Sequence, residues 1–158
     1  MDSFIIDTNV LIKLKNFNTF VFESLWENIE SGVKEKKLYS IDLVKTELEK
    51  GYDQANKPWN KFHEDYNFFI DVSECENSDK YMEIVGELER FEEFQKGLEK
   101  DIWADPFLIA IAYIEKDIVI TEENLNKNPK RKIPYVCEEL GIKCMTFDDF
   151  MIEQGWKW

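Results

Sequence analysis

The sequence predicts an α/β fold, a parallel β-sheet flanked by helices in three layers. Short apolar runs of strand length recur along the chain, and segments with helical periodicity separate them. Strands that alternate with helices form parallel sheets, because each crossover helix packs back onto the sheet. With 158 residues the chain has the length of one domain, so we expect residues 1–158 to form a single domain.

The expected strands are the apolar runs at 4–6, 38–40, 68–72, 118–120 and 142–146. The runs at 4–6 and 118–120 contain no polar residue, which is typical of strands buried on both faces. Each of these two runs ends abruptly in polar residues, at Asp7 and at Thr121. Both runs are therefore expected to be buried strands.

The expected helices follow from apolar residues spaced three and four positions apart. They cover 20–34, a segment from Asp42 with Gly51 just past its end, 78–91 with Ser78 as its cap, 104–115, 134–140, and a last segment from near Asp148. Apolar spacing also resumes after Asp7, from Val10. The segment 104–115 is markedly apolar, which predicts burial on more than one side.

Charge and composition exclude several classes of protein. The net charge is −13, with 33 acidic against 20 basic residues, which argues against a general nucleic-acid binder. The charge is uneven: residues 71–101 hold eleven acids and four bases, whereas Lys127, Lys130, Arg131 and Lys132 form a local basic cluster. No apolar run reaches the length of a membrane span and no basic leader is visible, so we expect a cytoplasmic protein without a membrane partner.

The single histidine, His63, excludes catalysis by paired histidines and disfavours a histidine-rich zinc site. The three cysteines are Cys75, Cys137 and Cys144, without a C-x-x-C pair. They are expected to be reduced thiols, although Cys137 and Cys144 are placed so that they could meet in space.

Carboxylates follow the strands or stand beside apolar helical residues at Asp7, Glu47, Asp105, Glu122 and Glu123. Carboxylates that converge at one sheet edge repel each other and favour a cation, and oxygen ligands select Mg²⁺ or Mn²⁺. Such ions commonly serve phosphodiester cleavage. Each acid also has an ordinary explanation: Asp7 and Asp105 as helix caps, Glu47 as a surface acid, and the other two as loop charges.

Four motifs together resemble the PIN-domain nucleases. They are Asp7-Thr8-Asn9-Val10-Leu11-Ile12, Val44-x-x-Glu47-Leu48, Ala104-Asp105-Pro106-Phe107-Leu108-Ile109-Ala110 and Val119-Ile120-Thr121-Glu122-Glu123. The resemblance implies a PIN-like fold and a divalent-metal-dependent endonuclease acting on single-stranded RNA. The length of the chain is most similar to toxins of the VapC type, which implies an antitoxin protein as partner.

By position, the resemblance assigns the family's first three acids to Asp7, Glu47 and Asp105. It implies that Thr8 and Asn9 position Asp7 and the attacking water. The fourth acid falls on Glu123, where the family usually has Asp, and Glu122 competes for the same role. Catalysis and metal binding are therefore expected from these acids.

The basic cluster Lys127, Lys130, Arg131 and Lys132, together with Asn9, would contact the RNA; a solvated loop is the alternative explanation for the cluster. A different class also remains open, a PIN-like module that binds a partner through the acidic stretch 71–101. A phosphohydrolase with Asp7 as nucleophile is disfavoured, because that chemistry usually places a second Asp where this chain has Asn9. The RNA target, the preferred metal and the oligomeric state, including a homodimer, stay open.

Overall fold

The computed structural model describes residues 2–51, 57–91, 104–123 and 133–157. Their centre is a parallel five-stranded sheet in the order β3-β2-β1-β4-β5. The strands are β1 (Phe4–Ile6), β2 (Leu38–Ile41), β3 (Phe69–Ile70), β4 (Ile118–Ile120) and β5 (Cys144–Met145). The expected α/β class and parallel sheet are confirmed, and β1 and β4 are neighbours at its centre.

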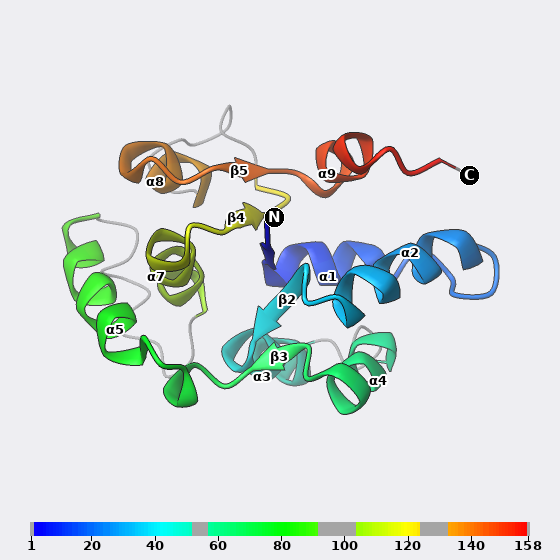
Figure 1. The fold of residues 1–158 in the computed structure, drawn as a ribbon, viewed down its shortest axis with the longest axis horizontal. Helices are drawn as coiled ribbons and strands as arrows, with labels where there is room; N and C mark the ends of the chain where they lie inside the picture. Colours follow the sequence, from blue (N-terminus) through cyan, green and yellow to red (C-terminus); the bar gives the residue numbers. More distant parts are fainter. Residues whose placement is uncertain (1, 52–56, 92–103, 124–132, 158) are drawn as a thin grey trace.

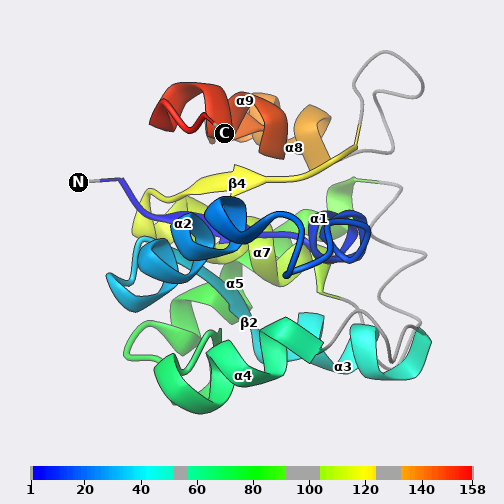
Figure 2. The same cartoon turned by 90° about the vertical axis from the view of Figure 1, so that its right-hand side faces the viewer.

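The helices cover both faces of this sheet. They are α1 (Thr8–Leu14), α2 (Glu23–Lys34), α3 (Asp42–Gly51), α4 (Lys57–Tyr66), α5 (Ser78–Glu87), α7 (Asp105–Glu115), α8 (Ile133–Leu140) and α9 (Phe147–Gln154). Figure 1 shows α5, α7 and α8 on one side of the sheet and α1, α2 and α9 on the other. In the turned view of Figure 2, α8 and α9 lie beyond β4, while α3 and α4 lie at the opposite edge.

The central elements are buried as their composition predicts. Every residue of β1 and β4 is buried. Helix α7 buries six of its residues, Pro106, Leu108, Ile109, Ala110, Ile111 and Ala112, so it packs on more than one side as expected. It contacts β1 and β4 on one flank and α5 on another. Burial of this much apolar surface is the main force that stabilises the layers.

A second, aromatic part of the core joins α2 and α4 to the β3 edge. Trp59 is fully buried and stacks on Phe68, with ring centroids 5.1 Å apart. It also contacts Trp26 at 5.4 Å and Phe62 at 5.6 Å. Trp59 is therefore a core residue, and its burial excludes a role in stacking on nucleic-acid bases.

Several element ends differ from the sequence expectation, each for a local reason. Helix α2 begins at Glu23 rather than at residue 20, because the Asn18 side chain accepts hydrogen bonds from the Phe20 and Val21 amides and holds a turn. Ser78 is the first residue of α5 and not its cap, which is Asn77. Helix α5 ends at Glu87 and continues as a 3₁₀ turn, Leu88–Arg90. The helix from Asp42 includes Gly51.

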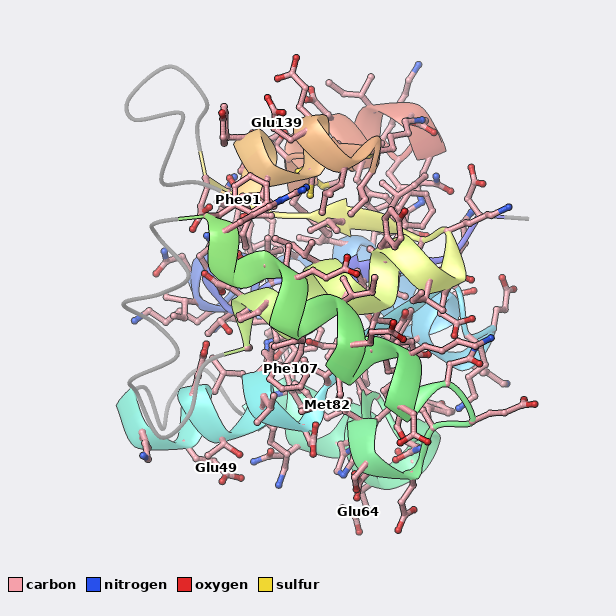
Figure 3. All side chains as sticks on the ribbon, turned by 90° about the vertical axis from the view of Figure 1, so that its left-hand side faces the viewer. Glu49, Glu64, Met82, Phe91, Phe107 and Glu139 are labelled. Carbon is pink, nitrogen blue, oxygen red and sulfur yellow. The ribbon has the colours of Figure 1, made fainter. Side chains whose placement is uncertain are left out.

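The acidic stretch maps in part onto the outer side of α5. Asp79, Glu83 and Glu87 are exposed there, while Tyr81 and Val85 pack inward. Figure 3 shows α5 running across this side of the molecule, with the half-exposed Met82 on it. Residues 92–101 of the stretch lie outside the described residues. Within the described ranges, no helix combines the length and apolar character that crossing a membrane requires.

Candidate carboxylate site at the carboxyl ends of β1 and β4

The order of the strands creates the position of the site. The crossover from β1 leads to β2 on one side, whereas β4 pairs with β1 on the other, so the chain leaves the two neighbouring strands in opposite directions. In open α/β sheets this divergence leaves a crevice beyond the carboxyl ends of the strands. Asp7 and Thr121 are the first residues after β1 and β4, and the Asp7 amide donates to the Ile120 carbonyl at 3.0 Å.

Asp7 is buried, with 3% of its surface exposed, and both carboxylate oxygens accept hydrogen bonds. Oδ1 accepts from the Thr8 amide at 2.7 Å, which makes Asp7 the N-cap of α1. Oδ2 accepts from the Thr121 hydroxyl at 2.8 Å. The capping role considered from the sequence is therefore real, but it uses only one of the two oxygens.

The electrostatic surroundings of Asp7 are unusual. The pKa of Asp7 is raised from 3.8 to about 7. Burial is the largest cause, the charges of Glu123 and, less strongly, Glu47 add to it, and the hydrogen bonds from Thr121 and Thr8 oppose the shift. A carboxylate held in low dielectric beside two others is a typical feature of functional sites.

Thr121 organises this site, a role that the sequence analysis did not assign. Its buried hydroxyl donates to Asp7 and accepts from the Asn9 side-chain nitrogen at 3.3 Å and from the Glu123 amide at 3.2 Å. A hydroxyl can donate one hydrogen bond and accept two, so Thr121 uses its full capacity. The available signal was its position, a polar residue directly after a wholly apolar strand.

Asn9 lies at the site but binds the neighbours of Asp7. Its side-chain oxygen accepts from the Glu122 amide at 3.1 Å, and its nitrogen donates to Thr121. Asn9 thus holds the turn that follows β4 in place. The Thr8 hydroxyl likewise donates to Glu47 rather than to Asp7.

Glu47 joins α3 to the ends of α1 and α7. Its Oε2 accepts from the Thr8 hydroxyl at 2.6 Å, and its Oε1 accepts from the Ala104 amide at 2.8 Å. Asp105 follows Ala104 in the first turn of α7 and is partly buried. The N-cap of α7 is Ala104, so the interpretation of Asp105 as that cap is wrong.

The side chains of Glu122 and Glu123 have different hydrogen-bond partners. Glu122 Oε2 accepts from Lys13 Nζ at 3.1 Å, and its Oε1 accepts from the Phe147 amide at 3.1 Å, which ties α9 to the sheet. Glu123 instead acts electrostatically on Asp7, and its Oε2 accepts from the Ile133 amide at the start of α8 at 2.6 Å. Glu123 is therefore the carboxylate that acts most strongly on Asp7.

The predicted acids thus lie at one edge of the sheet, but many of their oxygens already accept hydrogen bonds from the protein's own donors, namely both oxygens of Asp7, Glu47 and Glu122 and one oxygen of Glu123. Within the described part of the chain, no three His, Cys, Asp or Glu side chains converge closely enough to hold a metal ion. Glu47 and Glu122 each use both oxygens on neighbouring amides and side chains. Like-charged carboxylates repel each other, so each is better stabilised by hydrogen-bond donors than by a second carboxylate.

Other predicted residues fall elsewhere. Lys127, Lys130, Arg131, Lys132 and Trp158 lie outside the described residues. Trp156 contacts the rings of Phe147 and Phe150, with centroids 6.3 and 5.2 Å away, so it packs on α9. His63 accepts a hydrogen bond from the Phe69 amide at 3.2 Å, which is a structural role.

Comparison with known structures identifies the fold. A chain in the crystal structure of VapBC2 from Rickettsia felis bound to a DNA fragment from their promoter is 24% identical, with a TM-score of 0.51 over 90% of this chain and 97% of that one. A chain in the DNA-bound VapBC structure from Salmonella typhimurium is 17% identical, with a TM-score of 0.52 over 93% and 99%. No curated protein matches the sequence.

These two likenesses extend over most of the chain and establish its architecture as that of the PIN domains of VapC proteins. A family profile described as a domain of unknown function (DUF4411) matches residues 4–158. The chain therefore belongs to the DUF4411 family, and its fold is a PIN-domain fold.

Proposed function

We propose that this protein is a Mg²⁺- or Mn²⁺-dependent endoribonuclease that cleaves single-stranded RNA and acts as the toxin of a toxin–antitoxin pair. The observation that carries the proposal is the buried Asp7, held between the ends of β1 and β4 and influenced by Glu123 and Glu47. The PIN-domain fold supports the same conclusion.

The chemistry of the donors fits a hard divalent cation. Asp7, Glu47, Asp105 and Glu123 offer only carboxylate oxygens. The pKa of Asp7 is elevated by burial and then by the charge of Glu123, and a bound cation would offset both effects. When bound, such an ion lowers the pKa of an attacking water and stabilises the leaving oxygen of a phosphodiester. The proposal assigns no such role to Glu122, because the cation of Lys13 already compensates the charge of its carboxylate.

The chain's own groups prepare this chemistry. The hydrogen bonds from Thr8 and Thr121 orient both oxygens of Asp7, and Asn9 fixes the turn that carries Glu123. Because these donors oppose the rise in the pKa of Asp7, they increase the fraction that is ionised near neutral pH. Lys127, Lys130, Arg131 and Lys132 remain the predicted contacts to RNA phosphates.

The partner is proposed by analogy. The two similar structures are VapBC assemblies bound to DNA, which supports a DNA-binding antitoxin encoded with this protein and cytoplasmic action of the pair. Residues 1–158 would then form a single PIN-like domain.

The decisive experiment is cleavage of a labelled single-stranded RNA pool with Mn²⁺, Mg²⁺ or EDTA. Wild type is compared with Asp7→Asn and with Asp71→Asn, a matched control in which the replaced carboxylate also caps a helical turn but is exposed. We expect cleavage that requires the metal, is lost in Asp7→Asn and persists in Asp71→Asn.

Retained cleavage in a folded Asp7→Asn protein would refute the proposed site. A wild type that neither cleaves nor gains melting temperature with millimolar Mn²⁺ would refute the nuclease itself, because a ligand of the native state stabilises it by mass action. A binding module acting through the acidic side of α5 would then be favoured.

A further inference from the structure

Two cysteines from different elements meet beside the carboxylate site. Cys137 lies on α8 and is fully buried, and Cys144 lies on β5 and is partly exposed. Helix α8 packs directly against β5, and the Cys144 side chain acts on the Cys137 thiol. The connection between them is short: Gly141 adopts a left-handed φ of 73°, and the Ile142 amide donates to the Cys137 carbonyl at 2.8 Å. The sequence placed the two residues within reach, and the fold brings them into contact.

The pair is adjacent to the proposed catalytic acids. The interaction with Cys144, burial, and the charges of Glu123 and Asp7 all raise the pKa of the Cys137 thiol. Cys137 is therefore close enough to both carboxylates to feel their charge. On the other side of the pair, Cys144 is aligned with Val119 on β4, the strand that leads to Thr121.

Helix α8 connects the thiols to Glu123 mechanically. The first residue of α8, Ile133, donates its amide hydrogen to Glu123 at 2.6 Å. Cys137 is four residues further on and thus lies one turn along the same side of the helix. The neighbouring Glu139 points away into solvent (Figure 3). A displacement of Cys137 toward β5 would therefore move the donor that holds Glu123.

We propose that Cys137 and Cys144 are a redox modification site, a dithiol that hydrogen peroxide converts reversibly into an intramolecular disulfide and that switches off the carboxylate site. The claim about cleavage rests on the proposed nuclease function, whereas the claim about disulfide formation does not.

One molecule of hydrogen peroxide suffices to oxidise the two thiols to the disulfide. The partly exposed Cys144, as thiolate, attacks one oxygen of hydrogen peroxide, which breaks the O–O bond and yields a sulfenic acid and, after proton transfer, water. The Cys137 sulfur then attacks that sulfenic sulfur, the S–S bond forms, and a second water leaves with the thiol proton. Two thiols are oxidised by two electrons and one peroxide is reduced to two waters. A dithiol reductant reverses the modification by exchange.

The modification has a structural consequence because a disulfide is short. Its sulfurs lie about 2.05 Å apart, well inside the contact distance of two sulfur atoms that are not bonded to each other. Drawing α8 and β5 together in a close-packed interior shifts the start of α8, and with it the Ile133–Glu123 hydrogen bond.

The test uses the full chain, reduced and then treated with hydrogen peroxide, in wild type, Cys144→Ser and Cys75→Ser. Cys75 is the matched control, since its Sγ contacts the Asp71 carbonyl at 3.4 Å on another part of the molecule. We expect wild type and Cys75→Ser to lose about 2 Da, as removal of two hydrogens requires, with a 137–144 crosslink in the peptide map. Cys144→Ser should not lose this mass. Cys137→Ala provides a second variant if the polar replacement fails to fold.

Two measurements then test whether the disulfide disturbs the carboxylate site. Amide hydrogen exchange at Ile133 should accelerate in the oxidised protein, and Mn²⁺-dependent RNA cleavage should fall by at least about tenfold and return with dithiothreitol, as expected for a displaced catalytic group. A crosslink involving Cys75, oxygen addition without a crosslink, or unchanged exchange at Ile133 would overturn the proposal. If the reduced protein does not cleave RNA at all, the nuclease assignment fails, while mass and exchange still decide the redox site.

Discussion

The hydroxyl of Thr121 donates a hydrogen bond to Oδ2 of Asp7 over 2.8 Å, joining residues 114 positions apart in the sequence. Because both partners are buried, this bond is shielded from water and links the ends of the two central strands. Its loss would leave an acceptor of Asp7 without a donor in the interior.

Thr121→Val tests this link, because it keeps the shape of the side chain and removes only the hydroxyl. We expect a loss of about 1–3 kcal/mol in the free energy of unfolding, since the partners of the hydroxyl stay buried. We also expect weaker RNA cleavage. Urea denaturation measures the first quantity. Thr46→Val is the control, as its hydroxyl contacts only the Asp42 carbonyl within α3, and a loss equal to that of the control would contradict the assigned role.

The raised pKa of Asp7 predicts a specific dependence of stability on pH. The folded state binds the Asp7 proton more tightly than the unfolded state, because the pKa rises from 3.8 to about 7 on folding. The resulting stabilisation is fully present below about pH 4 and is lost as the pH rises through about 7, by an amount on the order of a few kcal/mol.

Asp7→Asn should abolish this dependence and unfold at higher urea concentration than wild type at pH 8. The measurement is urea denaturation in EDTA at pH 5 and pH 8. Asp71→Asn is again the control and should keep the wild-type slope with pH. A wild-type protein whose stability does not fall between these pH values would contradict the raised pKa of the buried Asp7 carboxyl group.

Glu122 and Glu123 should differ in their response to the same substitution. Glu123→Gln removes a charge that acts on Asp7, so cleavage should fall by about a hundredfold or more, as for loss of a catalytic group. Glu122→Gln keeps an acceptor for the Phe147 amide and weakens only the contact with Lys13. It should retain cleavage and cost at most about 1 kcal/mol of stability, because this ion pair is partly exposed. Equal loss of cleavage in both variants would refute the distinction.

Two buried tryptophans form a matched pair for the aromatic core. Trp26 Nε1 donates to the Phe17 carbonyl at 2.6 Å, whereas Trp59 Nε1 is buried without a hydrogen-bond partner among the residues that the structure describes. Trp59→Phe loses packing but removes a donor that has no partner among those residues. Trp26→Phe loses packing and breaks an existing hydrogen bond. We expect Trp26→Phe to lower the free energy of unfolding by about 1 kcal/mol more than Trp59→Phe does. The reverse order, measured by urea denaturation, would contradict this interpretation.

The sequence predicted the α/β class, the five strand positions and most of the helices, because apolar periodicity reflects local backbone geometry. The strands were expected somewhat longer than β3 and β5 prove to be, and the cap at Ser78 was assigned one residue too late. Such errors concern the ends of elements, where side-chain hydrogen bonds such as those of Asn18 decide the boundary.

For the candidate site, the sequence by itself determined which acids follow the central strands, since Asp7 stands directly after one apolar run and Glu122 and Glu123 follow the other within three residues. Only the tertiary structure decided what each side chain contacts. Three features depend on contacts between different elements. They are the bonds of Thr121 to both Asp7 and Asn9, the different surroundings of Glu122 and Glu123, and the approach of Cys137 to Cys144. Periodicity identifies the face of an element on which a residue lies. Hydrogen bonds, however, require distances of about 3 Å, and only the packing of the whole chain determines side-chain distances with that precision.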